Sequence, residues 1–229
     1  MSGPLARDAL RETLRETAST AFTLLLFAVV CAALLAGAYL ATRPAIEHSE
    51  QAEKRALLIQ VLPPGGFDND LVQAARALPV DRLLGLKRPG QAYVARRGAT
   101  AVAVVLEAVA PDGYAGEIRL LVGITADGAL TGVRVTAHKE TPGLGDYIEV
   151  AKNDWILQFD GKRLDAPATE GWKVRKDGGQ FDAYAGATIT PRAVVKAVHS
   201  ALRYFAAHRD TLLAAPGDAA PPPQKEPTP

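Results

Sequence analysis

Two threonines, Thr188 and Thr190, stand beside a turn of small residues, just before a helix that is expected to begin at Pro191. Thr190 is placed as the N-cap of that helix, and proline is favoured at the first helical position, so the start of the helix accounts for Thr190 and Pro191. Thr188 has no such role. It follows Gly186 and Ala187 and faces the positive end of the helix dipole, where backbone N–H groups can bind an anion. A phosphate group is therefore the expected ligand at Thr188.

Other phosphate-binding and hydrolytic motifs are missing from the sequence. It contains no Gly-Lys-Ser/Thr of a P-loop, and no Gly-x-Gly-x-x-Gly follows a predicted strand. A nucleophilic threonine would need a base within hydrogen-bond reach, but the spacing of the four histidines indicates neither a catalytic triad nor a metal cluster. These histidines are His48, His138, His199 and His208. His138 is interpreted as structural and His199 as a surface or flank residue, so neither a catalytic residue nor a metal site is predicted.

A second candidate segment is the loop HKETPGLGDYIE, residues 138–149, which follows a predicted strand. Gly143 and Gly145 would let its backbone adopt conformations closed to other residues and approach a ligand closely. A single Gly-x-Gly is common in turns and does not define a site. The carboxylates of Glu140 and Asp146 are interpreted as solvated loop groups.

Both segments need a scaffold, and the hydrophobic pattern predicts an α+β domain with a mainly antiparallel sheet packed by helices. Four stretches are rich in strand-forming residues, and short turns containing glycine separate them, as expected for antiparallel strands. These stretches are residues 91–97, 99–109, 117–125 and 129–138. Residues 171–176 are predicted as a fifth strand, and residues 67–78 as a short helix.

The predicted final helix runs from Pro191 to about His208. Its buried stripe is expected at helical spacing and consists of Val194, Val198, Leu202 and Phe205. Trp155 and Trp172 are assigned to the core, because large aromatic rings are usually buried. The whole domain is predicted to span residues 91–210.

An uncharged stretch of 24 residues, 18–41, is long enough to cross a membrane as a helix. A cleaved signal peptide is the alternative, since Ala36-Gly37-Ala38 could be a cleavage site, but the stretch exceeds the usual ~7–15 apolar residues. Arginines before the span favour a cytoplasmic leader at residues 1–17. The large domain is therefore expected outside the cytoplasm.

The remaining segments are assigned as connectors. Pro44 is expected to end the membrane helix, so residues 42–90 are predicted to form a separate helical connector. Residues 211–229 are rich in proline and lack an apolar face, which predicts a disordered tail. A net charge of +1 and 6% aromatic residues argue against nucleic acid as a partner. The single cysteine, Cys31, has no partner for an internal disulfide.

Residues 182–190, DAYAGATIT, resemble the flavinylation motif of the FMN-binding domain family, Asp-x-x-Ser/Thr-Gly-Ala-Thr. The resemblance implies that a phosphoester bond joins Thr188 to FMN. Asp182 would be the acid at the start of the motif, and Gly186 and Ala187 the small residues that admit the phosphate. The alanine before Gly186 departs from the Ser/Thr of the motif, so no hydrogen bond is expected from that position.

The loop after the fourth predicted strand carries a second resemblance. Its ETPGLG, residues 140–145, is similar to another motif of the same domains, whose Glu, Thr and Leu lie against the isoalloxazine ring of FMN. In this sequence these residues are Glu140, Thr141 and Leu144. Residues 112–124, DGYAGEIRLLVGI, also resemble the glycine–tyrosine turn and following strand of the family.

With its predicted N-terminal membrane helix followed by the two motifs, the sequence resembles the family of RnfG proteins. These proteins are components of Rnf electron-transport complexes. The related flavoprotein component of Na+-translocating NADH:quinone reductases is the alternative. The resemblance implies an electron carrier with covalent FMN rather than a complete enzyme. Its partners would be the other membrane subunits of a complex that couples electron transfer between ferredoxin and NAD to ion movement.

The resemblance also implies maturation by a separate flavin transferase that uses FAD and a metal ion. Arg192 and Lys196 are expected to add positive charge near the phosphate. Two other interpretations stay open at this point. The chain could be an anchored FMN-binding module outside any pump, or an assembly factor that holds no flavin.

Overall fold

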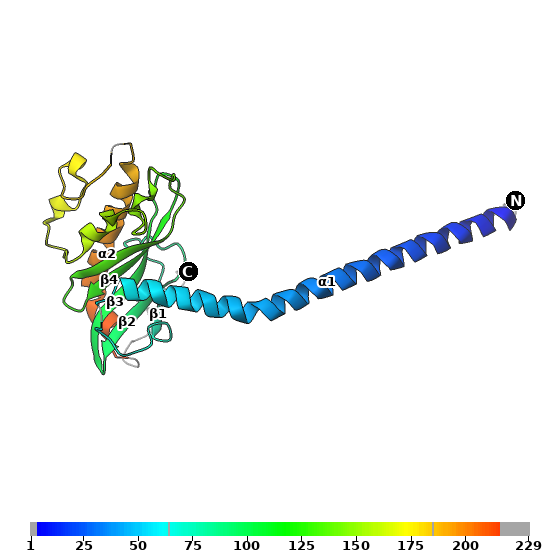
Figure 1. Ribbon diagram of the computed structural model, residues 1–229, viewed down its shortest axis with the longest axis horizontal. Helices are drawn as coiled ribbons and strands as arrows, with labels where there is room; N and C mark the ends of the chain where they lie inside the picture. The colour runs from blue at the N-terminus through cyan, green and yellow to red at the C-terminus, as the bar shows by residue number, and fades with distance from the viewer. Residues whose placement is uncertain (1–3, 64, 185, 216–229) are drawn as a thin grey trace, which may run out of the picture. The chain divides into compact units, whose positions relative to one another are not determined.

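The computed structural model describes residues 4–63, 65–184 and 186–215. The chain divides into two compact units, and the boundary lies between Ala52 and Glu53. The described part of the first unit is helical, and the second unit is an α+β domain (Figure 1). The predicted fold class is confirmed.

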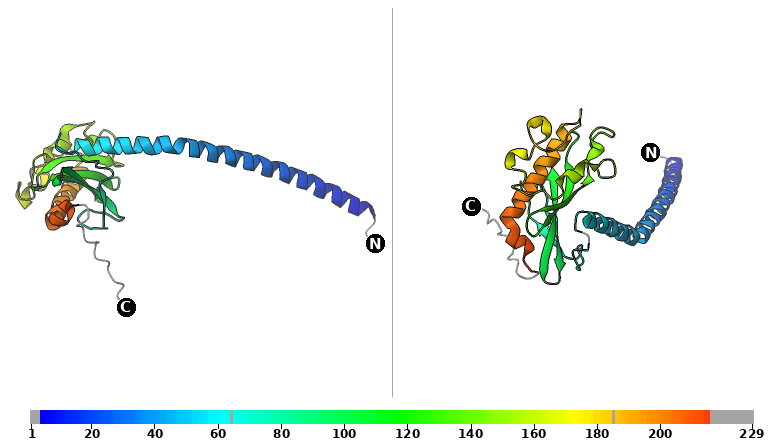
Figure 2. Two further views of the ribbon diagram at one scale, coloured as in Figure 1. Left: turned by 90° about the horizontal axis from the view of Figure 1, so that it is seen from below. Right: turned by 60° about the vertical axis from the view of Figure 1, so that its left-hand side comes forward.

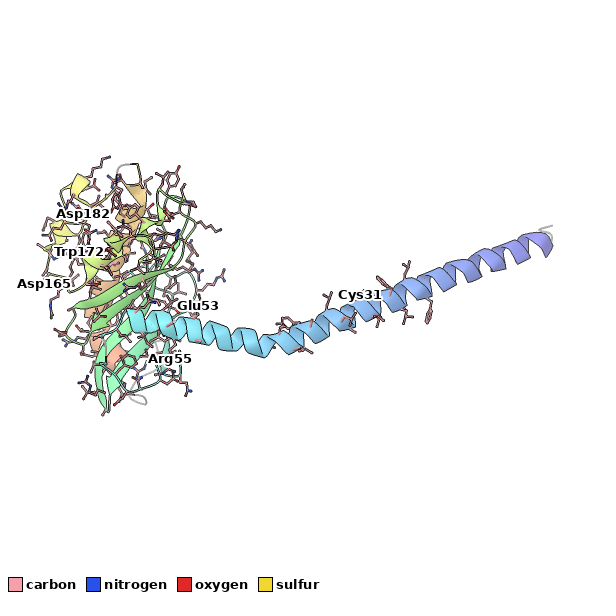
Figure 3. The ribbon with its side chains drawn as sticks, in the orientation of Figure 1. Cys31, Glu53, Arg55, Asp165, Trp172 and Asp182 are labelled. Carbon is pink, nitrogen blue, oxygen red and sulfur yellow. The ribbon has the colours of Figure 1, made fainter. Side chains whose placement is uncertain are left out.

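Helix α1 (Pro4–Gln60) forms the described part of the first unit, and its last turns belong to the second. The segment Leu24–Arg43 is long and apolar enough to cross a membrane. Apolar side chains such as Phe27 and Leu35 are exposed in this segment, as expected where lipid is the surrounding solvent, and Cys31 lies among them (Figure 3). The predicted N-terminal apolar helix is therefore present.

The expected break at Pro44 is not found. The backbone of α1 stays helical through residues 44–60, so the helix predicted for the connector is the C-terminal part of α1. A proline removes one backbone hydrogen bond of a helix, and the residues that follow it here are mostly strong helix formers. The short helix predicted for residues 67–78 is also wrong. Asp70 accepts hydrogen bonds from two of the amides that follow it, in a turn that leads into strand β1 (Ala75–Leu78).

The domain is built on a five-stranded antiparallel sheet in the order β1-β2-β3-β4-β5. Strands β2 to β5 correspond to the four predicted strands. Their bounds are Gly90–Arg97, Thr100–Ala110, Ile118–Thr125 and Leu130–Ala137. The fifth strand is β1, which pairs with β2 at the edge of the sheet, and not residues 171–176.

Both faces of the sheet are covered. One face packs against helix α2 (Ile189–Leu213), which lies across it (Figure 2), and the predicted stripe is buried there. The opposite face packs against Leu58 and Val61, at and just after the end of α1. Gly123 of β4 allows this approach, since a Cβ atom there would lie 2.1 Å from the carbonyl oxygen of Val61. The middle strands are thus buried on both sides, and α2 is fixed to one of the two faces.

The C-terminal end of α2 is held by an arginine of the sheet. The buried side chain of Arg96 donates hydrogen bonds to the carbonyl oxygens of Leu213, at 2.9 Å, and of Ala214. A charged donor at the last carbonyls stabilises a helix end. α2 therefore continues past its predicted end, although the backbone at His208 departs from helical geometry. The first residues of the predicted tail belong to α2, and residues 216–229 lie outside the described residues.

Between β5 and α2 the chain forms four short 3-10 helices, η1 (Asp146–Ile148), η2 (Asp154–Phe159), η3 (Thr169–Gly171) and η4 (Arg175–Asp177). Their core is aromatic. The rings of Trp155 and Phe159 lie 5.6 Å apart and those of Trp172 and Phe181 lie 5.2 Å apart, so both tryptophans are core residues as predicted. Trp155 also donates its indole N–H to the carbonyl oxygen of Asp182, at 2.7 Å. The aromatic core thereby supports the segment that leads to Thr188.

Candidate functional site

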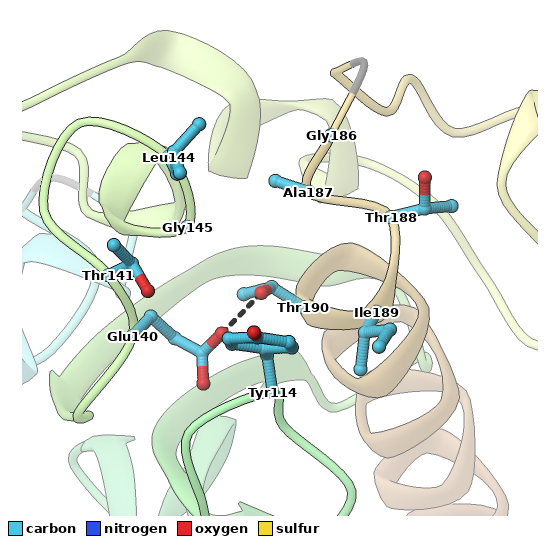
Figure 4. A pocket seen from close by; sticks show the side chains of 10 residues that line it. All are labelled: Tyr114, Glu140, Thr141, Leu144, Gly145, Gly186, Ala187, Thr188, Ile189 and Thr190. Atoms are coloured by element: carbon cyan, nitrogen blue, oxygen red, sulfur yellow. Dashed lines mark hydrogen bonds between the residues drawn. The ribbon is translucent and has the colours of Figure 1, made fainter.

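Ten residues line a pocket of about 290 Å³ at the N-terminal end of α2 (Figure 4). They come from three segments, which are the turn after β3, the loop after β5 and the start of α2. The residues are Tyr114, Glu140, Thr141, Leu144, Gly145, Gly186, Ala187, Thr188, Ile189 and Thr190. Six of the seven predicted site residues are among them. The pocket therefore brings together the two motif segments, residues 140–145 and 186–190, which are separated by 40 residues of sequence.

Glu140 lines this pocket and is only 3% exposed as a residue. One carboxylate oxygen accepts a hydrogen bond from the Thr190 hydroxyl, and the other accepts one from the amide of Ala115 at 3.0 Å. The backbone amide of Glu140 donates to Nδ1 of His138, at 3.0 Å. The expectation of a solvated loop carboxylate is therefore wrong for Glu140, because its carboxylate oxygens and its amide all have protein partners.

The rest of the loop is also tightly bonded. The carbonyl oxygen of Thr141 accepts hydrogen bonds from the amides of Leu144 and Gly145, at 3.1 and 2.9 Å. Asp146, predicted to be solvated, is at the edge of burial and accepts a hydrogen bond from the amide of Gly143 at 2.8 Å. These bonds fix the backbone that carries Thr141 and Leu144 into the pocket.

The two glycines of the loop have different roles. Gly143 has φ +76°, a left-handed conformation that favours glycine, and this agrees with the prediction. Gly145 has φ −102°, which any residue can adopt. A Cβ atom at Gly145 would instead lie 2.9 Å from Cβ of Glu140 and 3.2 Å from the Thr190 hydroxyl oxygen. Gly145 is therefore required for packing against the buried carboxylate.

Thr188 is the N-cap residue of α2, with φ −82° and ψ −23°, and its side chain makes no capping hydrogen bond. It is half-buried, and in Figure 4 its hydroxyl points away from the Glu140–Thr190 hydrogen bond. The first helical hydrogen bond runs from the amide of Arg192 to the Thr188 carbonyl oxygen, at 3.3 Å. The amides of Ile189 and Thr190 precede that bond, and Pro191 has no amide hydrogen, so two N–H groups at the helix start lie outside the helical hydrogen-bond pattern.

The predicted capping role of Thr190 is wrong. α2 begins two residues earlier than expected, at Ile189, so Thr190 lies inside the first turn. Its side chain is 1% exposed and donates to Glu140. The local sequence gives little sign of this bond, because its acceptor lies 50 residues earlier in the chain.

Three large apolar side chains of the pocket are exposed. Tyr114, Leu144 and Ile189 are 68%, 54% and 46% accessible to solvent. Each comes from a different one of the three segments that form the pocket. Exposed apolar surface around a pocket is typical of a site for a flat, partly apolar ligand.

Asp182 is the one predicted site residue that does not line this pocket. Its carboxylate pairs with Arg175 at 2.7 Å, and the residue lines two polar hollows instead. Its backbone is held by Trp155 and by Gln158, whose side-chain oxygen accepts from the Asp182 amide at 2.9 Å. Asp182 therefore positions the chain leading to Thr188. Ala185, at the position that departs from the flavinylation motif, lies outside the described residues.

The two cations expected near the phosphate are engaged elsewhere. Arg192 forms a two-point ion pair with Asp177, with both distances at 2.6 Å, and this pairing lowers the pKa of Asp177 and raises that of Arg192. Lys196 pairs with Asp112. Neither cation lines the pocket, so an anion at Thr188 would depend on backbone amides and the helix dipole.

His138 and His199 have structural partners. Nε2 of His138 lies 2.6 Å from a carboxylate oxygen of Glu149, which supports the predicted structural role. His199 is partly buried, in keeping with a flank position on α2: its ring stacks on that of Trp172 with the centroids 5.1 Å apart, and burial lowers its pKa. Among the described residues no group of three or more His, Cys, Asp or Glu could hold a metal ion.

Comparison with known proteins agrees with this geometry. Residues 113–203 match the FMN-binding domain family, and residues 10–61 match the N-terminal region family of RnfG. The class of protein defined by fold and site is therefore an FMN-binding domain that follows an N-terminal apolar helix.

The chain is similar over most of its length to proteins named as the G component of an ion-translocating oxidoreductase complex. It is 53% identical to the one from Pseudomonas aeruginosa over 91% of this chain and 97% of that protein. The corresponding protein of Vibrio cholerae is 47% identical over 82% of this chain and 90% of its own length. The chain belongs to this RnfG family of ion-translocating oxidoreductase complexes. Its family and the single apolar segment of α1 both support a single-pass membrane protein.

The residues of the pocket fit FMN. The first two amides of α2 and the Thr188 hydroxyl suit a phosphate, and the exposed apolar side chains suit the flat ring system. Gly186 has φ +90° and open space where a Cβ atom would lie, so the chain turns without obstructing the approach to Thr188. Four further residues line the pocket beside the six predicted ones: Gly145, Ile189 and Thr190 come from the two motif segments, and Tyr114 comes from the glycine–tyrosine turn.

Proposed function

We propose that this chain carries FMN joined through its phosphate to the hydroxyl oxygen of Thr188. In this proposal it is the electron-carrying RnfG component of an Rnf complex, which transfers electrons between ferredoxin and NAD and moves ions across the membrane. One geometric observation supports the attachment. Thr188 lines the pocket directly before the first amides of the helix, and its hydroxyl makes no capping hydrogen bond and points away from the buried Glu140 (Figure 4).

The attachment step requires a flavin transferase and FAD. The Thr188 hydroxyl oxygen attacks the FMN phosphorus of FAD and a new P–O bond forms. The phosphoanhydride bond to the AMP half breaks, AMP leaves, and the hydroxyl proton passes to a base of the transferase. This chain is the substrate of the step, in keeping with the lack of any histidine among the residues that line the pocket.

The residues of the pocket then hold the attached group. The amides of Ile189 and Thr190 and the dipole of α2 stabilise the remaining negative charge of the phosphodiester. Tyr114 and Leu144 offer apolar surface to the ring from two different segments. When bound, FMN supplies one-electron transfer, and the protein supplies binding and orientation.

Thr188→Val tests the attachment because valine keeps the shape of threonine and removes its hydroxyl. The full chain is produced with the transferase, and covalent flavin is measured by fluorescence on a denaturing gel and by intact mass. We expect the wild type to carry one FMN and Thr188→Val to carry none. Thr131→Val, which removes a hydroxyl hydrogen bond to Val61 outside the pocket, is the matched control and should keep the flavin. An unmodified wild type, or a flavin band that persists in Thr188→Val, would contradict the proposal.

We also propose that residues 1–17 are cytoplasmic and that the FMN-binding domain lies on the periplasmic side of the inner membrane. The arginines of the leader support this orientation. Glu170 is exposed on the domain, so Glu170→Cys should react with a membrane-impermeant maleimide in spheroplasts. Ala6→Cys should react only after the membrane is opened. The reverse pattern would place the domain in the cytoplasm.

A further inference from the structure

The buried carboxylate of Glu140 connects all three segments of the pocket. It belongs to the loop after β5, it accepts from the Ala115 amide in the turn after β3, and it accepts from the Thr190 hydroxyl in the first turn of α2. Ala115 follows Tyr114, and Thr190 follows Ile189. Two exposed apolar side chains of the pocket, Tyr114 and Ile189, are therefore sequence neighbours of residues that donate to this carboxylate. The third, Leu144, lies four residues after Glu140 itself.

The space around the carboxylate is made by glycines. A Cβ atom at Gly113 would lie 3.0 Å from one Glu140 oxygen, and a Cβ atom at Gly145 would lie 3.2 Å from the other. Both oxygens accept one hydrogen bond each, and the residue is only 3% exposed. A buried acceptor that loses its donor pays the cost of desolvation without compensation, so the arrangement is sensitive to each partner.

We propose that Glu140 and Thr190 are positioning residues that hold the three segments in the geometry needed for flavin attachment and for the environment of the attached ring. This inference rests on the proposed function. It assigns to the second threonine of the DAYAGATIT segment a role distinct from that of the first: Thr188 receives the phosphate, and Thr190 sets the pocket. Glu140 acts through its protein partners, since both its oxygens are already engaged by them.

The first measurement uses the full chain produced without the transferase, in detergent. Hydrogen exchange of the backbone is compared for wild type, Thr190→Val and Thr190→Ser. Thr190→Val should raise the exchange rates of residues 113–116, 140–145 and 189–192 together, by roughly tenfold, because the bond to a charged acceptor is lost. Thr190→Ser keeps the hydroxyl and should restore protection. Thr131→Val, the control outside the pocket, should leave these three segments unchanged.

The second measurement uses the same variants with the transferase and FAD. The initial rate of covalent flavin incorporation should fall roughly tenfold in Thr190→Val and recover in Thr190→Ser. Glu140→Gln leaves one acceptor oxygen where the carboxylate offers two, so the hydrogen bonds to Ala115 and Thr190 cannot both be kept as they are, and its flavin should show a shifted visible absorption spectrum and midpoint potential. A general loss of stability alone would move neither of these two properties in the fraction that is folded and flavinylated.

The outcomes separate this inference from the proposed function. If the wild type carries no covalent flavin, the proposed function fails, whereas hydrogen exchange still tests the role of Thr190. If the wild type is flavinylated, and Thr190→Val matches it in exchange, incorporation and spectrum, the positioning role is wrong. If Thr190→Val does not fold, the same decision rests on Glu140→Gln: an unchanged spectrum and potential overturn the proposal, and a shift of both supports it.

Discussion

The loop 140–145 and the segment 186–190 face each other across one pocket and are held in different ways (Figure 4). Four backbone amides of the loop and the carboxylate of Glu140 are hydrogen-bonded to the protein, and Glu140 at its start is buried. At the other wall, Thr188 is half-buried and its hydroxyl caps nothing. The comparison teaches that the pocket combines a preorganised side with an available one. Under the proposed function, another protein modifies Thr188, which requires an accessible wall, and the residues that orient the ring require a fixed one.

The largest effect is expected when one carbon atom is added to the preorganised wall, the loop 140–145. Gly145→Ala places a Cβ atom 2.9 Å from Cβ of Glu140, and the crowding should lower the free energy of unfolding by about 1–3 kcal/mol. Because the displaced group is Glu140, flavin incorporation per folded molecule should fall as well. Chemical denaturation and gel fluorescence of the full chain measure the two quantities.

Gly143→Ala is the matched control for this change. An added Cβ atom meets nothing within 4 Å there, and the cost comes only from the left-handed backbone, about 1–2 kcal/mol. Incorporation per folded molecule should therefore stay at the wild-type level. Equal losses of incorporation in the two variants would show that the loop needs its backbone conformation and not the space around Glu140.

A smaller effect is expected from alkaline pH at the available wall. The hydroxyl of Tyr147 donates to the carbonyl oxygen of Ala187 at 3.2 Å, and burial raises the pKa of Tyr147 from 10.0 to about 12. A raised pKa means that the folded state keeps this proton more tightly than the unfolded state does. The resulting stability is fully present below pH 10 and is lost as pH rises toward 12.

Tyr147→Phe isolates this contribution. The variant should lose about 1–2 kcal/mol less stability between pH 10 and 12 than the wild type, after allowance for partial solvent screening. Burial also raises the pKa of Tyr93 and Tyr204, so a slope remains in the variant. The free energy of unfolding, measured by urea titration at several pH values, should show this difference. If the free energy of unfolding falls in parallel with pH in the two proteins, the fold does not raise the pKa of Tyr147.

The same contrast explains what the sequence predicts and what it does not. Strands β2 to β5 and the buried stripe of α2 follow from hydrophobic periodicity, which is a local signal. The motif residues identify six residues of the pocket because the resemblance already contains the three-dimensional relation between two segments. Thr190 is misassigned as a cap because its partner, Glu140, is distant in sequence. The edge strand β1 is missed because only four residues pair, and their composition favours a helix.

The smallest effect is expected where sequence reasoning predicts a large one, at Arg192. Positive side chains near a helix N-terminus would ordinarily be assigned to a bound phosphate. Here Arg192 is paired with Asp177 and lies outside the pocket, so Arg192→Ala should leave the rate of flavin incorporation within about twofold of wild type, as for other exposed ion pairs. Asp177→Asn, which frees the arginine, is the complementary variant. If it raises the rate while Arg192→Ala lowers it, the phosphate is held partly by side-chain charge. If both variants match the wild type, the helix amides are sufficient, and the available wall of the pocket functions through its backbone.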